Sequence, residues 1–127
     1  MNQQLKLKEM NINKIIYWVA TTVMCGIFAF SASMYFTKTE MVKGFFEALN
    51  HPSYVVIPLA TLKVLGIIAV LTKQSKLLTE WAYAGFFFDA VLAYAAHTVA
   101  GDGGTMFSTV AIISIIVSRY MYGRLYL

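Results

Sequence analysis

The chain has 127 residues, of which 59% are hydrophobic and only 13% are charged. Ordinary globular chains have roughly 45–50% apolar and 25% charged residues, and a soluble chain this small cannot bury so much apolar surface. The formal net charge of +4 does not indicate a nucleic-acid-binding protein, because the cations are scattered rather than gathered in a stripe. The single cysteine, Cys25, excludes an internal disulfide, a redox CxxC pair and a thiolate zinc cage. The composition therefore indicates a membrane protein, and the length predicts a single domain over residues 1–127.

Four apolar runs are long enough to cross a bilayer as α-helices, which need about 20 residues for roughly 30 Å of hydrocarbon. They cover residues 15–36, 54–71, 78–100 and 105–122. The tract Gly101-Asp102-Gly103-Gly104 between the last two can only reverse the chain, so we expect these spans to form an antiparallel hairpin. The first run, with Ser31-Ala32-Ser33, also fits a cleaved signal peptide. It continues through Phe36, however, which favours a retained span.

Residues 40–50 predict a short amphipathic helix rather than a span. Their apolar side chains repeat at helical spacing on one face, with Lys43 and Glu47 opposite. The apolar residues are Met41, Val42, Phe45, Phe46 and Leu49. We interpret this segment as an interfacial helix that covers the bundle in the first outer loop. The predicted fold class is therefore all-α: a four-helix transmembrane bundle with one short amphipathic helix.

The cations predict the orientation of the spans. Seven lie before the first span, between the second and third, or at and beyond the inner end of the fourth: Lys6, Lys8, Lys14, Lys73, Lys76, Arg119 and Arg124. The other side has two, Lys38 and Lys43. By the positive-inside rule, the termini and the second loop face the cytoplasm. We expect a multi-pass protein with its N and C termini inside.

Two ionisable residues lie close to mid-membrane, where a charge costs a few kcal/mol on insertion scales and needs a partner, a cavity or a function. With the helical rise, Lys63 lies about 14 Å below the outer end of its span and Asp89 about 16–17 Å. Opposite charges at similar depths on consecutive helices are expected to meet. Three interpretations remain open: a neutralised pair that fixes helix register, a polar pocket or proton-coupled path, and a pair that does not form.

His97 and Tyr94 extend this candidate polar site toward the outer end of the third span. Eight helical residues separate Asp89 and His97, which places them on one broad face of the helix. His97 is either a hydrated interfacial residue or a pH-sensitive, ligand-contacting one. With His51 and Asp102 it shows no metal-ligand spacing, so we predict no metal site. We also predict no catalytic residue.

Several tracts resemble the DoxX-like family. They are residues 80–89 (EWAYAGFFFD), 94–97 (YAAH) and 101–102 (GD) for its third helix, 62–66 (LKVLG) for its second helix, 45–49 (FFEAL) for its first loop and 17–21 (YWVAT) for its opening. The resemblance runs from Tyr17 to about Tyr122. It implies a four-helix bundle, and we expect it in the cytoplasmic (inner) membrane of a bacterium.

The resemblance implies little about chemistry. The family takes its name from a subunit associated with thiosulfate:quinone oxidoreduction, while more remote relatives assist membrane-protein assembly or cargo export. We expect a non-enzymatic subunit or accessory factor of a membrane complex, in contact with lipid and with protein partners or further copies of itself. The alternatives are a quinone-linked redox subunit and a small-solute or proton pathway at Lys63 and Asp89. No cofactor is evident from the sequence. A quinone is the cofactor that a quinone-linked redox subunit would require.

Overall fold

The computed structural model describes residues 3–48, 50–101 and 103–127. These residues form five α-helices and one short 3₁₀ turn, and the described ranges contain no strand. The elements are α1 (Gln3–Thr37), α2 (Thr39–Ala48), the 3₁₀ turn η1 (Ser53–Val55), α3 (Val56–Thr72), α4 (Lys76–Ala100) and α5 (Thr105–Tyr126). The all-α prediction is confirmed. Leu49 of the predicted amphipathic face and Asp102 of the predicted turn lie outside the described residues.

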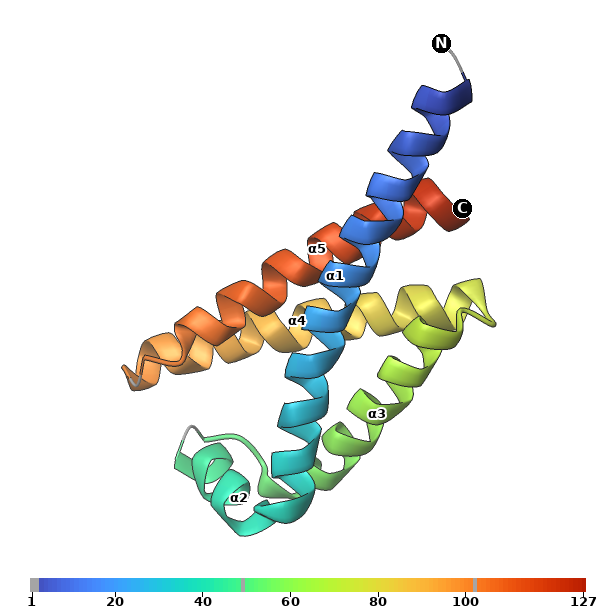
Figure 1. The fold of residues 1–127 in the computed structure, drawn as a ribbon. Coiled ribbons are helices and arrows are strands. Elements are labelled where there is room, and N and C mark those ends of the chain that lie inside the picture. The colour runs from blue at the N-terminus through green and yellow to red at the C-terminus, as the bar shows by residue number, and fades with distance from the viewer. Residues whose placement is uncertain (1–2, 49, 102) are drawn as a thin grey trace.

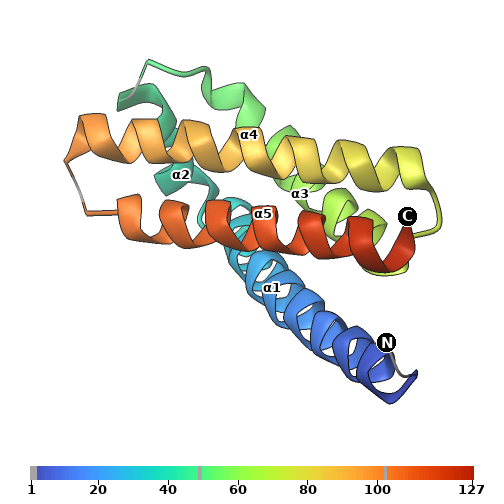
Figure 2. The same cartoon turned by 90° about the horizontal axis from the view of Figure 1, so that it is seen from above.

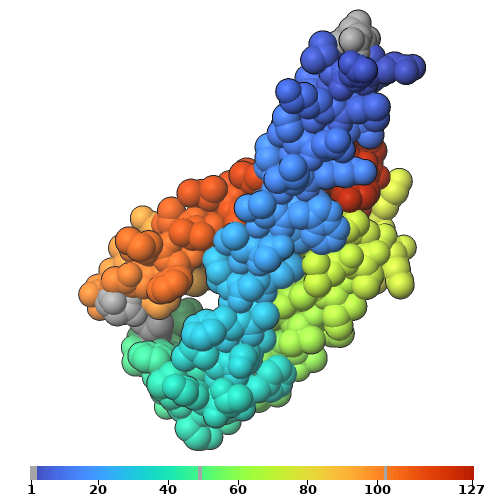
Figure 3. Space-filling view, in the orientation of Figure 1, coloured from blue at the N-terminus to red at the C-terminus, as the bar shows by residue number. Residues whose placement is uncertain are grey.

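The four long helices form a ring in which each contacts two others. α1 packs on α3 and α5, and α4 packs on the same two helices. α4 and α5 run antiparallel, side by side (Figures 1 and 2). The two termini and the α3–α4 connection lie at one end, which we call the terminal end. α2 and the α4–α5 turn lie at the distal end, where the helices diverge and Figure 3 shows a hollow between them.

Three segments are long and apolar enough to cross a membrane: Gln3–Thr37, Ser53–Thr72 and Thr105–Tyr126. α4 has 25 residues, about 37 Å of helix, but Asp89, Tyr94 and His97 interrupt its apolar sequence. Large apolar side chains are exposed along all four long helices. In water this surface would be costly, whereas hydrocarbon solvates it.

The first helix begins about twelve residues before the predicted span. Residues 3–14 contain leucine, lysine, glutamate and methionine but no glycine or proline, so their helix propensity is high. Apolar periodicity alone could not indicate this extension, because residues 3–14 do not form an apolar run. The segment projects beyond the rest of the bundle (Figure 1), and all its described residues except Asn13 are exposed.

Local signals set both ends of α4. Before it, Lys73 ends α3 in the left-handed conformation, with φ of 52°. Ser75 then caps α4, where its Oγ accepts a hydrogen bond from the backbone N–H of Leu78 at 3.2 Å. At the other end, Gly101 adopts φ of 64°, a conformation that glycine accepts without steric cost. These caps orient α4 antiparallel to both α3 and α5.

The short helix α2 covers the distal end of the bundle. Val42 is buried, whereas Met41 and Phe45 are 43% and 59% exposed. Phe46 packs edge-on against Tyr35 of α1, with ring centroids 5.9 Å apart. The amphipathic helix predicted over residues 40–50 is therefore present over Thr39–Ala48. One side of its apolar surface contacts the bundle and the other is open.

Candidate functional site

Lys63 is the one lysine buried among the described residues, with 6% of its surface exposed. It lies on α3 between α1 and α4, and two groups of α1 surround its ammonium. Nζ donates a hydrogen bond to Ser31 Oγ at 2.6 Å and lies 3.9 Å from the ring centroid of Tyr35. A ring face at this distance attracts a cation, most strongly where water is excluded.

Asp89 of α4 supplies the counter-charge. Its Oδ2 lies 3.5 Å from Lys63 Nζ, and its side chain is 31% exposed against 7% for that of Lys63. The separation exceeds the 2.7–2.9 Å of a charge-assisted hydrogen bond. The contact with Asp89 is therefore an ion pair, while the short hydrogen bond of the ammonium goes to Ser31. The juxtaposition predicted from their depths is thus present in the structure. We call Ser31, Tyr35, Lys63 and Asp89 the distal polar cluster.

The other two residues of the predicted site lie farther along α4. Tyr94 and His97 are five and eight residues beyond Asp89, about 7.5 and 12 Å along the helix. The Tyr94 side chain belongs to the exposed surface, with 44% accessible. His97 is partly buried, and its imidazole lies against Gly104 at the α4–α5 turn. The structure therefore brings together Lys63 and Asp89, and it places Tyr94 and His97 nearer the distal end.

Sequence reasoning missed Ser31 and Tyr35 as partners of Lys63. The small residues around Ser31 predicted only close helix packing, and Tyr35 was one of several aromatics near the end of a span. The sequence did contain one indication: Ser31 and Tyr35 are four residues apart, so they share one face of their helix. That spacing could not show which way this face of α1 points.

A groove between α3 and α4 borders the pair. Its volume is about 890 Å³, and its lining is mostly apolar. Lys63 and Asp89 lie toward one end, and Thr72, Gln74 and Ser75 toward the other. Such a groove can hold an apolar chain against the helices and a polar head against the ion pair.

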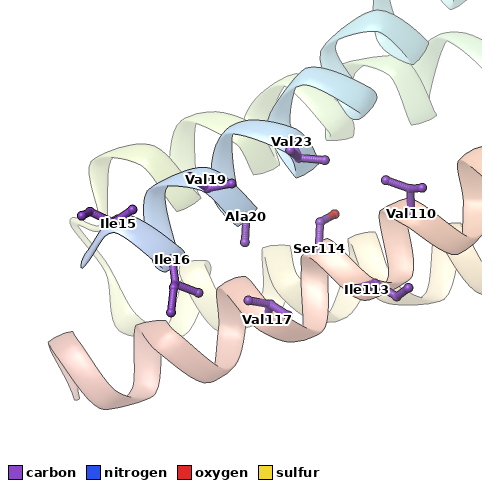
Figure 4. Close-up of a pocket in the computed structure, with 9 residues that line it drawn as sticks. All are labelled: Ile15, Ile16, Val19, Ala20, Val23, Val110, Ile113, Ser114 and Val117. Atoms are coloured by element: carbon purple, nitrogen blue, oxygen red, sulfur yellow. The ribbon is translucent and has the colours of Figure 1, made fainter. Parts of the chain in front are cut away.

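A second groove lies between α1 and α5 and has a volume of about 400 Å³. Figure 4 shows its lining, from α1 and α5: Ile15, Ile16, Val19, Ala20, Val23, Val110, Ile113, Ser114 and Val117. Ser114 is its one hydroxyl, and its Oγ donates to the carbonyl of Ala111 in its own helix at 2.9 Å. This groove offers no charged group to a ligand.

A second set of polar side chains lies nearer the terminal end. Ser118 of α5 is hydrogen-bonded to Thr21 of α1 at 2.6 Å and to the hydroxyl of Tyr83 of α4 at 2.7 Å. The buried hydroxyl of Tyr17 has no hydrogen-bond partner among the described residues. We call Tyr17, Thr21, Tyr83 and Ser118 the terminal polar cluster. Sequence reasoning did not identify it.

Two cations lie below this cluster at the terminal end. Arg119 holds the Glu80 carboxylate in two contacts, Nε to Oε1 at 2.7 Å and a hydrogen bond to Oε2 at 2.9 Å. Lys73 Nζ lies over three rings, those of Trp18, Tyr126 and Tyr17, at 4.7, 4.9 and 5.2 Å from their centroids. Partial burial lowers the pKa of Lys73 below its usual value.

The fold and its apolar helices define a multi-pass helical membrane protein, in which Lys63 of α3 forms an ion pair with Asp89 of α4. The model of the DoxX-like family matches residues 19–118. The chain therefore belongs to the DoxX-like family, as its sequence tracts predicted. No curated protein and no solved structure matches it. Among the described residues, no group of three or more His, Cys, Asp or Glu side chains could hold a metal ion.

Proposed function

We propose that this protein is a subunit or accessory factor of a membrane complex, and that the projecting segment of α1 contacts its partner. α1 has 35 residues, about 52 Å of helix, whereas the hydrocarbon core needs only roughly 30 Å. The first turns of α1 therefore extend beyond the hydrocarbon. We further propose that four helices, α4 included, cross the membrane, with both termini on the cytoplasmic side of a bacterial inner membrane.

The exposed apolar side chains of this segment carry the proposal. Leu5, Leu7, Met10 and Ile12 are 46–58% exposed, in a part of α1 that neither lipid tails nor the bundle covers. Lys6, Lys8 and Lys14 accompany them.

The arrangement favours a protein partner over a lipid surface. A helix that lies on a membrane gathers its apolar residues on one face. Here Leu5 and Leu7 point about 200° apart, since each residue turns the helix by 100°. The segment is also continuous with the span. We infer that an acidic and apolar segment of a partner protein packs around it.

The test is native gel electrophoresis of solubilised membranes from the cells that make this protein. We expect the wild-type chain to migrate in an assembly larger than the purified chain. A Leu5→Ser, Leu7→Ser, Met10→Ser variant should migrate like the purified chain. The matched control is Met106→Ser, Phe107→Ser, since both residues are 74% exposed at the distal end. Identical migration of wild type and the triple variant would count against the proposal.

A second candidate is that the complex is quinone-linked, and the α3–α4 groove favours it. Quinone carbonyls need hydrogen-bond donors, which the Lys63 ammonium supplies, and Asp89 can exchange a proton beside it. The apolar walls of the groove suit an isoprenoid tail. The residues of the distal polar cluster therefore fit a quinone head, although no electron transfer follows from binding alone.

Trp81 lines this groove and can report on binding. In a Trp18→Phe variant, Trp81 is the sole tryptophan, since the chain has two. We expect added quinone to quench its fluorescence saturably, and the quenching to weaken in Lys63→Gln and Asp89→Asn. The Trp81→Phe protein, which retains Trp18, is the control. Quenching that rises linearly with quinone, with the same slope for both tryptophans, would remove this candidate.

A further inference from the structure

Two polar clusters lie at different levels inside the bundle, and their α1 residues Thr21 and Ser31 are about 80° apart around the helix axis. Thr21 belongs to the terminal polar cluster and Ser31 to the distal one, ten residues or about 15 Å apart along the helix. Each cluster joins three helices. The distal cluster uses α1, α3 and α4, and the terminal cluster uses α1, α4 and α5.

An apolar layer separates the two clusters. It consists of Met24, Phe28 and Phe86, which are 0%, 3% and 4% exposed. The Phe28 and Phe86 rings stack across the centre of the bundle with centroids 4.2 Å apart and an interplanar angle of 23°. Lys63 Nζ lies 6.0 Å from the Phe28 centroid, so the layer begins directly beneath the distal cluster. Closed apolar constrictions of this kind exclude water and ions.

Phe86 packs closely on α3 and borders the α3–α4 groove. Its ring lies over Gly66 of α3, where an added Cβ would be 2.7 Å from Cζ. Gly66, Gly85 and Phe86 also line the α3–α4 groove. A rotamer change of Phe86 toward the groove would therefore open the stack without moving a helix. Side-chain rotations of this type are fast relative to helix motion.

We propose that the bundle contains a proton path from the distal polar cluster to the terminal polar cluster, and that the Phe28–Phe86 stack is its gate. This activity goes beyond the proposed subunit role. A proton enters at Asp89, whose carboxylate is 31% exposed, and weakens its attraction to Lys63. When the stack opens, the proton leaves Asp89 through water and reaches the hydroxyls of Tyr83, Ser118 and Thr21. Each hydroxyl releases its own proton as it accepts one, and the last releases a proton to water at the terminal end. No electron is transferred.

The groups facing this path have the chemistry that it requires. Hydroxyls donate and accept at once, so they pass a proton on without keeping it. Carboxylates inside membranes mark such relays. Other titratable groups near the path are Lys63 and Tyr35 in the distal cluster, and Tyr17, Cys25 and Tyr122 below the stack. Lys73 lies beneath Tyr17, and the ion pair of Glu80 and Arg119 lies next to Ser118.

The experiment measures proton flux into liposomes that contain the purified protein and an internal pH dye, driven by a potassium diffusion potential. We expect slow flux for wild type and flux at least about tenfold faster for Phe86→Ala, since the constriction is removed. Adding Asp89→Asn to Phe86→Ala should return the flux to near the wild-type rate. The control is Phe88→Ala, the same change at a residue 64% exposed on the same helix, with wild-type flux expected.

Three results would overturn the proposal. They are wild-type flux in folded Phe86→Ala, a leak in Phe86→Ala that Asp89→Asn leaves unchanged, and an equal leak in Phe88→Ala. If Phe86→Ala does not fold, Phe28→Leu replaces it, with a smaller increase of at least about threefold expected from a narrower side chain in the constriction. Wild-type flux in that variant contradicts the proposal equally. The native-gel migration of these variants tests the subunit role separately.

Discussion

The distal and terminal polar clusters stabilise the same bundle with different chemistry. The distal cluster holds a full charge at Lys63 and a partly exposed counter-charge at Asp89, beside a groove. The terminal cluster around Ser118 is neutral and buried. A buried charge without a counter-charge costs more free energy than a buried neutral hydroxyl without a hydrogen-bond partner. The charged cluster is therefore the more sensitive of the two, and it is the one that borders a groove.

The largest expected effect follows from isolating the Lys63 charge. Asp89→Leu leaves a buried ammonium without its counter-charge and should lower the free energy of unfolding by about 3–5 kcal/mol. Lys63→Met should cost less, because the carboxylate of Asp89 is partly exposed and is therefore less costly to leave unpaired. Reversible unfolding in mixed micelles measures both. The double variant should recover to within about 1 kcal/mol of wild type; additive losses would show that the two side chains do not interact.

Breaking the terminal cluster should have a smaller effect. Ser118→Ala removes the partner of both Thr21 and Tyr83 and should lower the free energy of unfolding by about 1–2 kcal/mol, the range of interhelical hydrogen bonds in membranes. Ser114→Ala is the matched control, because its hydroxyl bonds only to its own helix. The same unfolding assay applies. A loss equal to or greater than that of Asp89→Leu would contradict the ranking of the two clusters.

Gly66 tests the packing of the apolar layer between the clusters. In Gly66→Ala the new methyl meets the Phe86 ring, and overpacking of about 1–3 kcal/mol outweighs a helix-propensity gain of about 1 kcal/mol. Gly85→Ala is the control, since no described atom lies within 4 Å of its added Cβ. Thermal unfolding should show Gly66→Ala less stable than wild type and Gly85→Ala equal or more stable. If Gly66→Ala were the more stable of the two variants, the Phe86 ring would not lie against Gly66.

The smallest effect concerns Lys73, beneath the terminal cluster. Burial lowers its pKa, so its NMR titration midpoint should fall below 10.5. The unfolded chain then binds more protons near this midpoint, and stability should rise as the pH increases through it. The charged Lys73 ammonium therefore lowers the free energy of unfolding at neutral pH, and this loss disappears when the ammonium is deprotonated in alkali. A midpoint at or above 10.5 would contradict the burial of this ammonium.

Much of the fold is predictable from the sequence, because apolar length and turn residues determine it locally. The helices that end at Thr37, Thr72 and Ala100 end within about one residue of the predicted spans. The extension of α1 to Gln3 was missed, since it depends on helix propensity in a polar segment. The rise per residue is constant along a helix, so the sequence placed Lys63 and Asp89 at similar depths and favoured their contact. It left open that no pair forms, and the structure places the two charges 3.5 Å apart.

The remainder of the candidate site depends on rotation of the helices about their axes, which periodicity does not specify across a bundle. Ser31 and Tyr35 contact Lys63 because α1 turns that face toward α3. Tyr94 and His97 were grouped with Asp89 by position along one helix, and the structure places them farther toward the distal end. Ser118 gave no signal at all, since serines in membrane helices usually bond to their own backbone.

The separation of the two clusters can be tested on a native reporter. Cys25 is the sole cysteine and is 8% exposed, one turn from Phe28 on the terminal side of the stack. The measurement is the rate at which a water-soluble thiol reagent modifies Cys25 in wild type, Phe86→Ala and Phe88→Ala. A dry layer predicts slow modification in wild type and Phe88→Ala and fast modification in Phe86→Ala. Fast modification in wild type would show that water already joins the two clusters and would contradict a closed gate.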